Sequence, residues 1–340
     1  MDLDLLTSSY DYDLPKELIA TAPLHPADEA RLLIYDRKTD TITHTIFKDI
    51  LDYLPQNLSV ILNDTKVIKA RIFGTKSSGG KVELLINKPM LDDTFLVYIR
   101  GRVKIDTKIT FDNDLSAIIK ELNDDGSRLV EFYQDESKLD FAKLIKILDS
   151  IGHIPLPPYI HREDNSDDET DYQTLFAKNN GSVAAPTASL HFTPKLLQKF
   201  QTKFNVGYLT LHVGAGTFKP IECEDILSHD MHSEYYEIDN ITQNLINDTQ
   251  NILAVGTTVT RTVEYFHRNN QSFGECDLFL HPQNEPQRVN HLLTNFHLPK
   301  STLIMLVSGF VGRQKALEIY DKAIKEKYRF YSYGDAMLII

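Results

Sequence analysis

A long run of short strand-like segments, with no strong helix among them, most restricts how this chain can fold. From Ala70 to Tyr133 apolar and polar residues follow a β-pattern in short runs, separated by turn signals such as Ser-Ser-Gly-Gly at 77–80. Strands so closely spaced predict a small barrel or sandwich. We therefore expect residues 63–149 to form a small all-β barrel domain.

The chain on either side of this segment alternates between strand and helix patterns. Thr193 followed by Pro194 is typical of a helix start, and the segment after Gly256 turns from a strand into a helix. The fold class expected is an α/β (α+β) main domain with a mixed sheet, built from 1–62 and 150–340 and interrupted by the inserted barrel. Apolar runs predict strands at 31–36, 58–62, 208–213, 251–255 and 277–281, and helical periodicity predicts helices at 138–150 and 314–327.

Cysteine content and hydropathy exclude a secreted disulfide scaffold and a membrane protein. Only Cys223 and Cys276 occur in 340 residues, which is typical of a reducing cytoplasm. The acidic N-terminus lacks the basic and apolar regions of a signal peptide. The longest apolar run, at 303–307, is far shorter than the ~20 residues that cross a bilayer. We expect a cytoplasmic protein that does not contact membranes.

Charge is distributed unevenly along the chain. The formal net charge is −12, which argues against nucleic-acid binding over the whole surface. Residues 60–108, however, hold ten basic and five acidic residues, a net charge of +5, so that −17 falls on the remainder. The basic residues of this segment fit either an ordinary solvated face or a local phosphate-binding face. In contrast, 163–171 has six acids in nine residues and is expected to be a mobile surface loop.

A glycine pair follows one of the predicted strands. In HVGAGTF at 212–218, Gly214 and Gly216 lack the third glycine of the dinucleotide-binding fingerprint. A Rossmann NAD site is therefore not expected. The two glycines fit a close approach of the backbone to a ligand and a simple tight turn equally well.

A threonine-rich helix start follows another predicted strand. In GTTVTRT at 256–262, Thr257, Thr258 and Arg261 accompany the free N–H groups of the first turn. Such a helix start suits a carboxylate or a phosphate. Ordinary capping of the helix by threonine explains the same residues.

Three histidine-containing segments are candidates for proton transfer or base stacking. In HDMHSE at 229–234, strand alternation would place His232 and Glu234 on one face, which suits proton transfer better than a closed metal site. A solvated loop remains the alternative. In GSVAAPTASLHFT and TNFHLPKST, Phe192 and Phe296 fit either stacking on a nucleobase or burial in the core.

A dozen segments, taken together and in order from about Tyr12 to Ile339, resemble one enzyme family, the S-adenosylmethionine:tRNA ribosyltransferase-isomerases of queuosine biosynthesis. Ser189 stands where that family usually has glycine, and Val259-Thr260 replaces its usual Ser-Val. The segments are YDLP with LIA (12–20), RLL (31–33), LNDTKVIKARIFG (62–74), GGKVELL (79–85), GHIPLPPYI (152–160), DYQTLFA (171–177), GSVAAPTASLHFT (181–193), LTLHVGAGTFKPI (209–221), HDMHSE (229–234), AVGTTVTRT (254–262), TNFHLPKSTL (294–303) and YRFYSYGDAML (328–338).

The resemblance implies an α/β main domain with an inserted β-barrel and an unusual reaction. S-adenosylmethionine serves as the ribosyl-donor substrate. Its ribosyl moiety is transferred to 7-aminomethyl-7-deazaguanine at the wobble position of tRNA and isomerised. The products are epoxyqueuosine-tRNA, adenine and methionine, and no metal is expected. The chemistry requires a base to take a proton from the ribose carbon beside the sulfonium, and fixed contacts for the amino-acid tail.

The resemblance also assigns expected roles to residues. Proton transfer is expected from Glu234 or His232, with His191 as a second acid/base candidate. Substrate contacts are expected from Asn63, Asp64, Thr65, Arg71, Thr187, Phe192, His212, Gly214, Gly216, Thr217, Thr257, Thr258, Arg261, Asn295, Phe296, His297 and Asp335. Contacts to tRNA are expected from Lys66, Lys69, Arg100, Arg102, Lys104 and Arg162.

Two other functions remain open from the sequence. An ordinary RNA methyltransferase would also use S-adenosylmethionine, but the Rossmann glycines are missing at the first strand. A non-catalytic RNA-binding module would show an aromatic and basic RNA signature, and none of the RRM or KH type occurs. Hydrolase, Walker and zinc motifs are also missing from the sequence. The expected partners are tRNA and S-adenosylmethionine, and the expected oligomeric state is a monomer.

Overall fold

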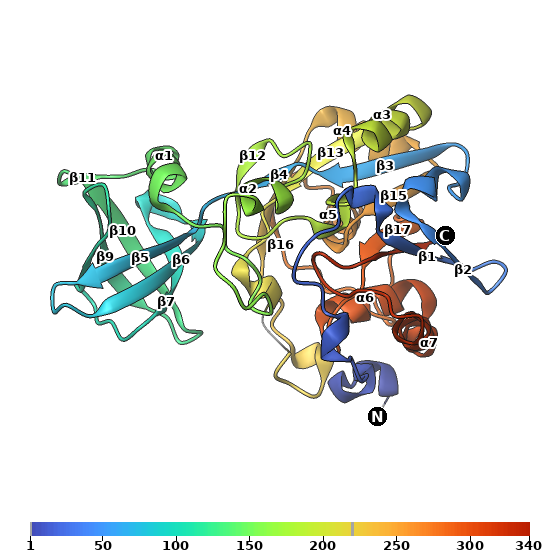
Figure 1. Cartoon of the computed structure of the whole chain (residues 1–340), viewed down its shortest axis with the longest axis horizontal. Coiled ribbons are helices and arrows are strands. Elements are labelled where there is room, and N and C mark those ends of the chain that lie inside the picture. The colour runs from blue at the N-terminus through green and yellow to red at the C-terminus, as the bar shows by residue number, and fades with distance from the viewer. Residues whose placement is uncertain (1, 219–220) are drawn as a thin grey trace.

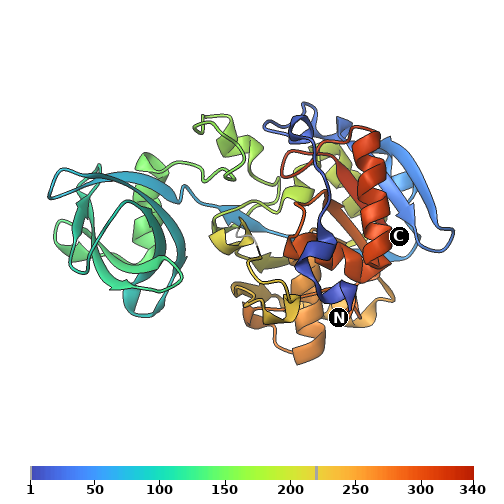
Figure 2. The same cartoon turned by 90° about the horizontal axis from the view of Figure 1, so that it is seen from below.

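The computed structural model describes residues 2–218 and 221–340, which form two bodies joined by a narrow waist (Figures 1 and 2). The larger body is built on a nine-stranded mixed sheet in the order β16-β14-β13-β3-β15-β17-β18-β1-β2. Its strands are β1 (Arg31–Asp36), β2 (Thr41–Ile46), β3 (Leu58–Asn63), β13 (Asn205–Leu211), β14 (Glu234–Ile238), β15 (Asn251–Val255), β16 (Phe273–Cys276), β17 (His291–Asn295) and β18 (Ala336–Ile339).

Strand β3 is the centre of this sheet. It runs parallel to β13 on one side and to β15 on the other, with Val60 opposite both Val206 and Leu253. Every residue of β3 is buried, as expected for a strand covered on both faces. After β3 the chain passes through the barrel before it returns to this sheet as β13, and β15 follows later on the opposite side of β3. The carboxyl ends of the parallel strands consequently lie at one edge of the sheet.

Helices cover both faces of the main sheet. They are α3 (Pro194–Lys203), α4 (Asn240–Asp248), α5 (Thr257–Asn269), α6 (Thr302–Val311) and α7 (Arg313–Lys325). Helix α1 (Phe141–Ile151) packs in the barrel instead, and the short α2 (Asp168–Asp171) lies in the segment that leads back from the barrel to the main sheet. Short 3-10 helices occur at Leu3–Leu5, Thr7–Tyr10, Lys16–Leu18, Ala27–Glu29, Phe47–Asp52, Leu91–Asp93, Thr187–Ser189, Ala215–Phe218 and Ile226–Ser228. In the described part of the chain, none of the helices has the length and apolar character needed to cross a bilayer.

Alternating residues of the central strands divide the core between the two faces. On one face Val60 and Leu253 pack with Phe200 of α3. On the other, Ile61 packs with residues of α4 and α5, including Val263. Helices α6 and α7 extend this second face over β1, β17 and β18.

The smaller body is a closed antiparallel barrel. Strand β10 pairs with β7 on one side and with β9 on the other, so the ring β10-β7-β6-β5-β8-β9 closes on itself. Inward residues of these strands and the apolar face of α1 form a single core. The strands are β5 (Arg71–Lys76), β6 (Lys81–Pro89), β7 (Phe95–Arg100), β8 (Lys108–Thr110), β9 (Leu115–Leu122) and β10 (Ser127–Gln134), with β11 (Ser137–Lys138) at one edge.

A two-stranded parallel pair lies where the chain enters and leaves the barrel. It joins β4 (Thr65–Val67) to β12 (Asn179–Ser182). The barrel strands lie within 63–149, and these limits for the inserted domain stay a proposal. The fold class expected from the sequence, a mixed-sheet main body with an inserted all-β barrel, is confirmed.

Three local predictions differ from the structure. Residues 277–281 form no strand, because the Arg261 guanidinium, rather than a neighbouring strand, bonds the carbonyl of Leu278. Residues 163–171 are not a surface loop throughout, because Asp168 in α2 is buried and ion-paired with Arg162. Strand β9 was not predicted, since the consecutive apolar residues at 117–119 hide its alternation.

Candidate active site

An open cavity lies where the carboxyl ends of β13, β15 and β17 meet, the edge at which open α/β sheets bind ligands. The space within it, including its opening to solvent, amounts to about 790 Å³. Segments far apart in sequence contribute to its walls. The described residues that border it are Tyr159, Tyr172, Ala184, Ala185, Pro186, Thr187, Ala188, Val213, Thr217, Gly256, Thr257, Thr258, Thr294, Asn295, Phe296, His297, Leu298, Ser301, Leu303, Tyr331 and Ser332.

The start of helix α5 forms one wall of the cavity. Gly256 precedes the helix with φ 101° and ψ 154°, a conformation almost confined to glycine. No side chain caps the helix, so the first N–H groups, beginning at Thr257 and Thr258, remain for a ligand. Together with the helix dipole, these groups favour an anionic ligand such as a carboxylate.

Tyrosines and a serine form a second wall. The rings of Tyr159 and Tyr331 lie with their centroids 4.5 Å apart. The Tyr159 hydroxyl accepts a hydrogen bond from the Ser332 backbone N–H at 3.0 Å and is also bonded to Ser332 Oγ. Burial raises the pKa of Tyr159 and of Tyr331 to about 12. Both phenols are therefore neutral near pH 7 and offer an aromatic surface with hydrogen-bonding tips.

His297 borders the cavity as a neutral imidazole. Burial lowers its pKa to about 3. Its Nε2 lies 2.9 Å from Thr294 Oγ1, and its backbone N–H donates to the Tyr320 hydroxyl at 3.2 Å. These contacts fix its position, so it is suited to hydrogen bonding with a polar ligand.

Asn295 connects the cavity to His191. Asn295 Nδ2 donates to His191 Nε2 at 3.2 Å and to the Tyr331 carbonyl at 3.2 Å. Its Oδ1 accepts from Thr187 Oγ1 at 3.4 Å. Because Nε2 of His191 accepts, the neutral ring carries its proton on Nδ1. Burial, and secondarily Arg329, lowers the pKa of His191 to about 3, so this histidine orients Asn295 rather than donating protons near neutral pH.

Glu234 and Arg261 form a buried ion pair beside the cavity. Arg261 Nη1 donates to Glu234 Oε2 at 2.6 Å, and its other nitrogens donate to the carbonyls of Leu278 and Cys276. Burial raises the pKa of the Glu234 carboxyl, but Arg261, His232 and the Gly214 N–H together outweigh it and hold this pKa below its usual range. A carboxylate held in this way is a weak proton acceptor. Arg261, in turn, has this carboxylate as its anionic partner.

The Gly-Ala-Gly loop, formed by Gly214, Ala215 and Gly216, is bound to the same carboxylate. Glu234 Oε1 accepts from the Gly214 N–H at 3.0 Å and from Thr217 Oγ1 at 3.1 Å. His232 Nε2 lies 3.6 Å from Glu234 Oε1 and 3.5 Å from Thr217 Oγ1. A Cβ on Gly216 would come within 2.7 Å of the His232 ring, so a glycine is needed there. The proximity of His232 to Glu234 that strand alternation predicted is confirmed.

A second hollow lies on the other side of this loop. It is a cleft between the barrel and the main body, bordered by Asn87 and Lys88 of β6 and by Gly214, Gly216 and His232 of the main body. Thr217 borders the first cavity, whereas Gly214 and Gly216 border the cleft. The Gly-Ala-Gly loop therefore lies between the two hollows, with His232 beside it.

Several residues predicted to contact substrate are used inside the protein instead. The ring of Phe192 packs in the core against Phe47 and Phe200, because its helix start is folded onto the sheet. The ring of Phe296 has no exposed surface and packs edge-on against Tyr320 and Tyr328. Asp335 accepts from the backbone N–H groups of Arg31 and Arg329, which ties two strands together. The Phe192 ring is thus part of the core, whereas Phe296 also borders the cavity, so its stacking on a base stays a proposal.

The polar residues of the LNDT segment at 62–65 bond other parts of the protein or border a different hollow. The Asn63 amide continues the pairing of β3 with β13, since its Oδ1 accepts from Leu211 N and its Nδ2 donates to Leu211 O, both at 3.0 Å. Asp64 accepts from Thr210 Oγ1 at 2.6 Å and borders another hollow. Thr65 Oγ1 lies 2.7 Å from His212 Nδ1. Burial lowers the pKa of His212 to about 4.

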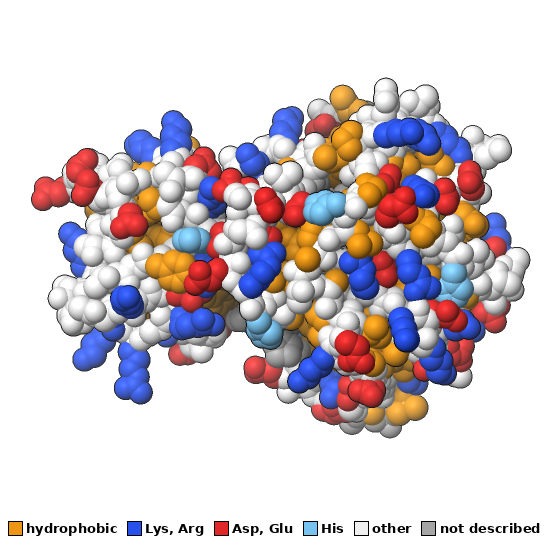
Figure 3. All heavy atoms as spheres, viewed as in Figure 1, with side chains coloured by type: hydrophobic (Ala, Val, Ile, Leu, Met, Phe, Trp, Pro, Cys, Tyr) orange, Lys and Arg blue, Asp and Glu red, His pale blue; other side chains and the backbone are white. Residues whose placement is uncertain are grey.

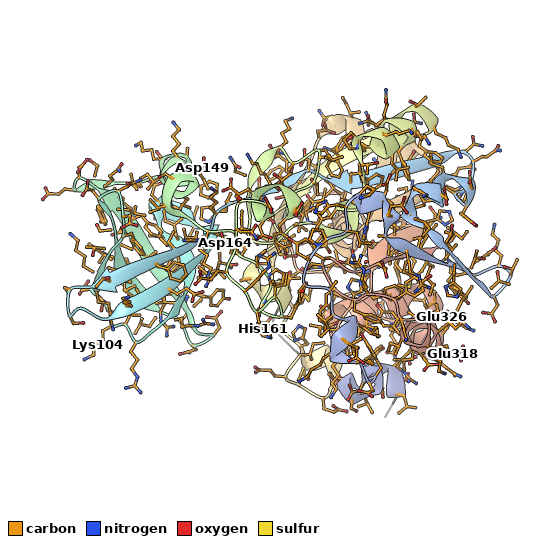
Figure 4. The ribbon with its side chains drawn as sticks, viewed as in Figure 1. Lys104, Asp149, His161, Asp164, Glu318 and Glu326 are labelled. Atoms are coloured by element: carbon orange, nitrogen blue, oxygen red, sulfur yellow. The ribbon has the colours of Figure 1, made fainter. Side chains whose placement is uncertain are left out.

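The basic residues predicted to contact RNA fall into two groups. Lys66, Arg102 and Lys104 are exposed, and Figure 4 shows Lys104 on the barrel, away from the main body. The remaining ones have acidic partners: Lys69 binds Glu169, Arg100 binds Glu83, and Arg162 binds Asp168 through both terminal nitrogens. Arg71, predicted to contact the substrate, also binds Glu83. Arg162 neutralises a buried carboxylate, and its contact to RNA stays a proposal.

Comparison with known proteins places the chain in a family. The model of the family described as queuosine biosynthesis protein matches residues 7–339. The chain belongs to this family. Proteins named S-adenosylmethionine:tRNA ribosyltransferase-isomerase from Aliarcobacter butzleri and Nitratiruptor sp. are 65% and 61% identical to it, each over 99% of both chains. The crystal structure of the S-adenosylmethionine tRNA ribosyltransferase from Thermotoga maritima matches with a TM-score of 0.55 and 33% identity, covering 97% of this chain and 99% of the other. The family predicted from the motifs is confirmed.

Some cavity residues were not predicted, although the family motifs contain them. Tyr159 lies in GHIPLPPYI, Tyr331 and Ser332 lie in YRFYSYGDAML, and Thr294 opens TNFHLPKSTL. Their presence in segments shared with the queuosine family was the available signal. Among the residues that the structure describes, no group of histidine, cysteine and acidic side chains is arranged to hold a metal.

Proposed function

We propose that the cavity binds S-adenosylmethionine and that the cleft admits the modified wobble base of tRNA. The chain belongs to the family of ribosyltransferase-isomerases that make epoxyqueuosine-tRNA, adenine and methionine. Two substrates must meet in this reaction, and the structure has two hollows on either side of one loop. This arrangement is the observation that carries the proposal.

The cavity offers separate surfaces for the two ends of S-adenosylmethionine. The α-carboxylate of its methionine part suits the uncapped start of α5, at Thr257 and Thr258. Its adenine suits the wall of alanines at 184–188 and the tyrosines opposite, because a purine is flat and apolar on its faces. Asn295 and His297 remain for hydrogen bonds to ribose or to the base edge.

His232 is the best-placed group for proton transfer. The ribose carbon beside the sulfonium must lose a proton, and the amine of the RNA base must then attack the sugar. His232 borders the cleft and lies beside Thr217, which borders the cavity, so it is next to both partners. Glu234 lies near enough to interact with the imidazole once it is protonated. We assign Glu234 this supporting role in place of the base itself.

Replacing His232 tests this assignment. We expect His232→Gln to slow single-turnover adenine release by ~10²-fold or more, the usual contribution of a general base, with little change in S-adenosylmethionine affinity. His267→Gln is the matched control, because His267 is exposed on α5 and borders neither the cavity nor the cleft, and its rate should stay near that of the wild type. Wild-type turnover by His232→Gln would refute the assignment.

The remaining proposals concern the setting of the enzyme. Cys223 and Cys276 are both unpaired, as expected in a reducing compartment, and the tRNA substrate is also found in the cytoplasm. We therefore assign the protein to the cytoplasm. We also propose that the protein acts as a monomer and that the reaction needs no metal.

A further inference from the structure

We propose that Asn87 of the barrel is a positioning residue for the S-adenosylmethionine site in the main body. Its side chain reaches out of β6 and holds the Gly-Ala-Gly loop. Asn87 Oδ1 accepts the Ala215 backbone N–H at 2.7 Å. This inference rests on the proposed function, because it takes the cavity to be the S-adenosylmethionine site.

A β-bulge explains why Asn87 points away from its own sheet. In the pairing of β6 with β7, Ile86 lies opposite Val97 and Lys88 lies opposite Leu96. Asn87 therefore has no partner across the pair. Bulges of this kind redirect a side chain and occur often beside active sites. Without the extra residue, the barrel would present no acceptor to the loop at this point.

The contact is close because the loop has no side chain in the way. A Cβ on Gly214 would lie 3.2 Å from Asn87 Oδ1, which is tighter than nearly all real contacts. Glycine therefore allows the barrel strand to approach the loop. This gives Gly214 a packing reason that the sequence alone left undecided between ligand approach and turn formation.

The hydrogen bond from Ala215 to Asn87 also fixes the cavity wall, because the same loop contains Thr217. Immediately before Ala215, the Gly214 N–H donates to Glu234, and two residues after it Thr217 donates to the same carboxylate. Thr217 also borders the cavity. Asn87 on one side and Glu234 on the other thus hold the wall between cavity and cleft. Loss of the Asn87 acceptor should loosen this wall although Asn87 does not border the cavity.

Binding of S-adenosylmethionine by variants, measured by calorimetry without tRNA, tests the inference. We expect Asn87→Ala to weaken binding about fivefold, the usual scale for one partly buried hydrogen bond. Asn87→Asp keeps an oxygen that can accept the Ala215 N–H, so it should bind within about twofold of the wild type. In turnover with tRNA, Asn87→Ala should raise KM for S-adenosylmethionine more than it lowers kcat.

The matched control is Glu275→Ala. Lys88, the next residue of β6, forms a salt bridge with Glu275 of the main body at 3.1 Å. Glu275→Ala removes this second tie between the bodies without touching the loop, and it should bind S-adenosylmethionine as the wild type does. Equal weakening by Glu275→Ala and Asn87→Ala, wild-type binding by Asn87→Ala, or failure of Asn87→Asp to restore binding would each overturn the inference. Failure of the proposed function itself would be distinguishable, because the wild type would then bind no S-adenosylmethionine.

Discussion

At the residue scale, Glu234 illustrates how the structure changes a role expected from the sequence. Its carboxylate is 2.6 Å from Arg261, and both side chains are almost completely buried. Removing one partner of such a pair leaves an uncompensated buried charge. We expect Glu234→Gln to lower the free energy of unfolding by ~3–5 kcal/mol. Chemical denaturation would measure this loss, and a variant of unchanged stability with no activity would instead support Glu234 as the base.

The stability of the protein should depend on this ion pair in acid. Burial raises the pKa of Glu234, but Arg261 and His232 outweigh it and lower the value from 4.5 to about 2. A lowered folded-state pKa gives stability that is present above pH 4.5 and is lost as the pH falls toward 2. The difference in unfolding free energy between wild type and Glu234→Gln should therefore shrink from pH 5 to pH 2. A difference that stays constant over this range would contradict the assignment.

Residue identity alone could not separate ligand contacts from structural ones. Phe192 and Phe296 have the right chemistry for stacking on a base, yet both rings lie in the core. Asn63 has the right chemistry for a ribose contact, yet its amide bonds Leu211. The difference depends on packing between segments more than a hundred residues apart, which local sequence does not determine. His232 and Glu234 were predicted to lie on one face, and His232 Nε2 does lie 3.6 Å from Glu234 Oε1, although His232 precedes β14 and is not part of the strand.

At the element scale, the glycine before α5 gives a direct test of the anion site. Gly256 and Gly312 both precede helices with positive φ, 101° and 81°, and neither has a side-chain cap. Gly256→Ala and Gly312→Ala should each cost ~1–3 kcal/mol of stability because of the strained backbone. Only Gly256 borders the cavity, so only Gly256→Ala should also weaken S-adenosylmethionine binding, as titration calorimetry would show. Equal affinity in the two variants would contradict the placement of the carboxylate.

Helices and strands were predicted best where one local pattern specified them. β1 and β15 occur at the predicted residues, and α3 begins at Pro194 with the Thr193 side chain as its cap. Residues 277–281 have a strand pattern, but the Arg261 guanidinium takes the backbone carbonyl of Leu278. The bulge at Asn87 was also not predicted, because it depends on the register between two barrel strands.

At the scale of the whole molecule, charge is expected to direct RNA to the barrel. Figure 3 shows several basic side chains along the lower rim of the barrel, and Lys104 lies there on the side away from the main body (Figure 4). Arg102 and Lys104 are exposed, whereas Arg162 is paired with Asp168. The sequence indicated this basic region but could not indicate which of its charges have acidic partners.

Charge reversal on the barrel tests this surface. We expect Arg102→Glu with Lys104→Glu to weaken tRNA binding and to reduce the log–log salt slope by roughly 0.7 for each phosphate that the protein no longer neutralises. Lys322→Glu with Lys325→Glu makes the same charge change on α7 of the main body, at the opposite end of the molecule, and should leave binding nearly unchanged. Filter-binding titrations over a range of salt concentrations would compare the two. An equal loss of affinity in both double variants would mean that net charge, and not the barrel surface, controls binding.

Product analysis tests the central claim most directly. The protein would be incubated with S-adenosylmethionine and tRNA carrying 7-aminomethyl-7-deazaguanine, and the small molecules and wobble nucleoside separated by chromatography. We predict adenine and methionine in equal amounts, appearing together with a wobble nucleoside that has gained the ribosyl-derived group. S-adenosylhomocysteine as the product would show methyl transfer, and intact tRNA binding with no product would leave only an RNA-binding protein. Either of these results would contradict ribosyl transfer in the cavity.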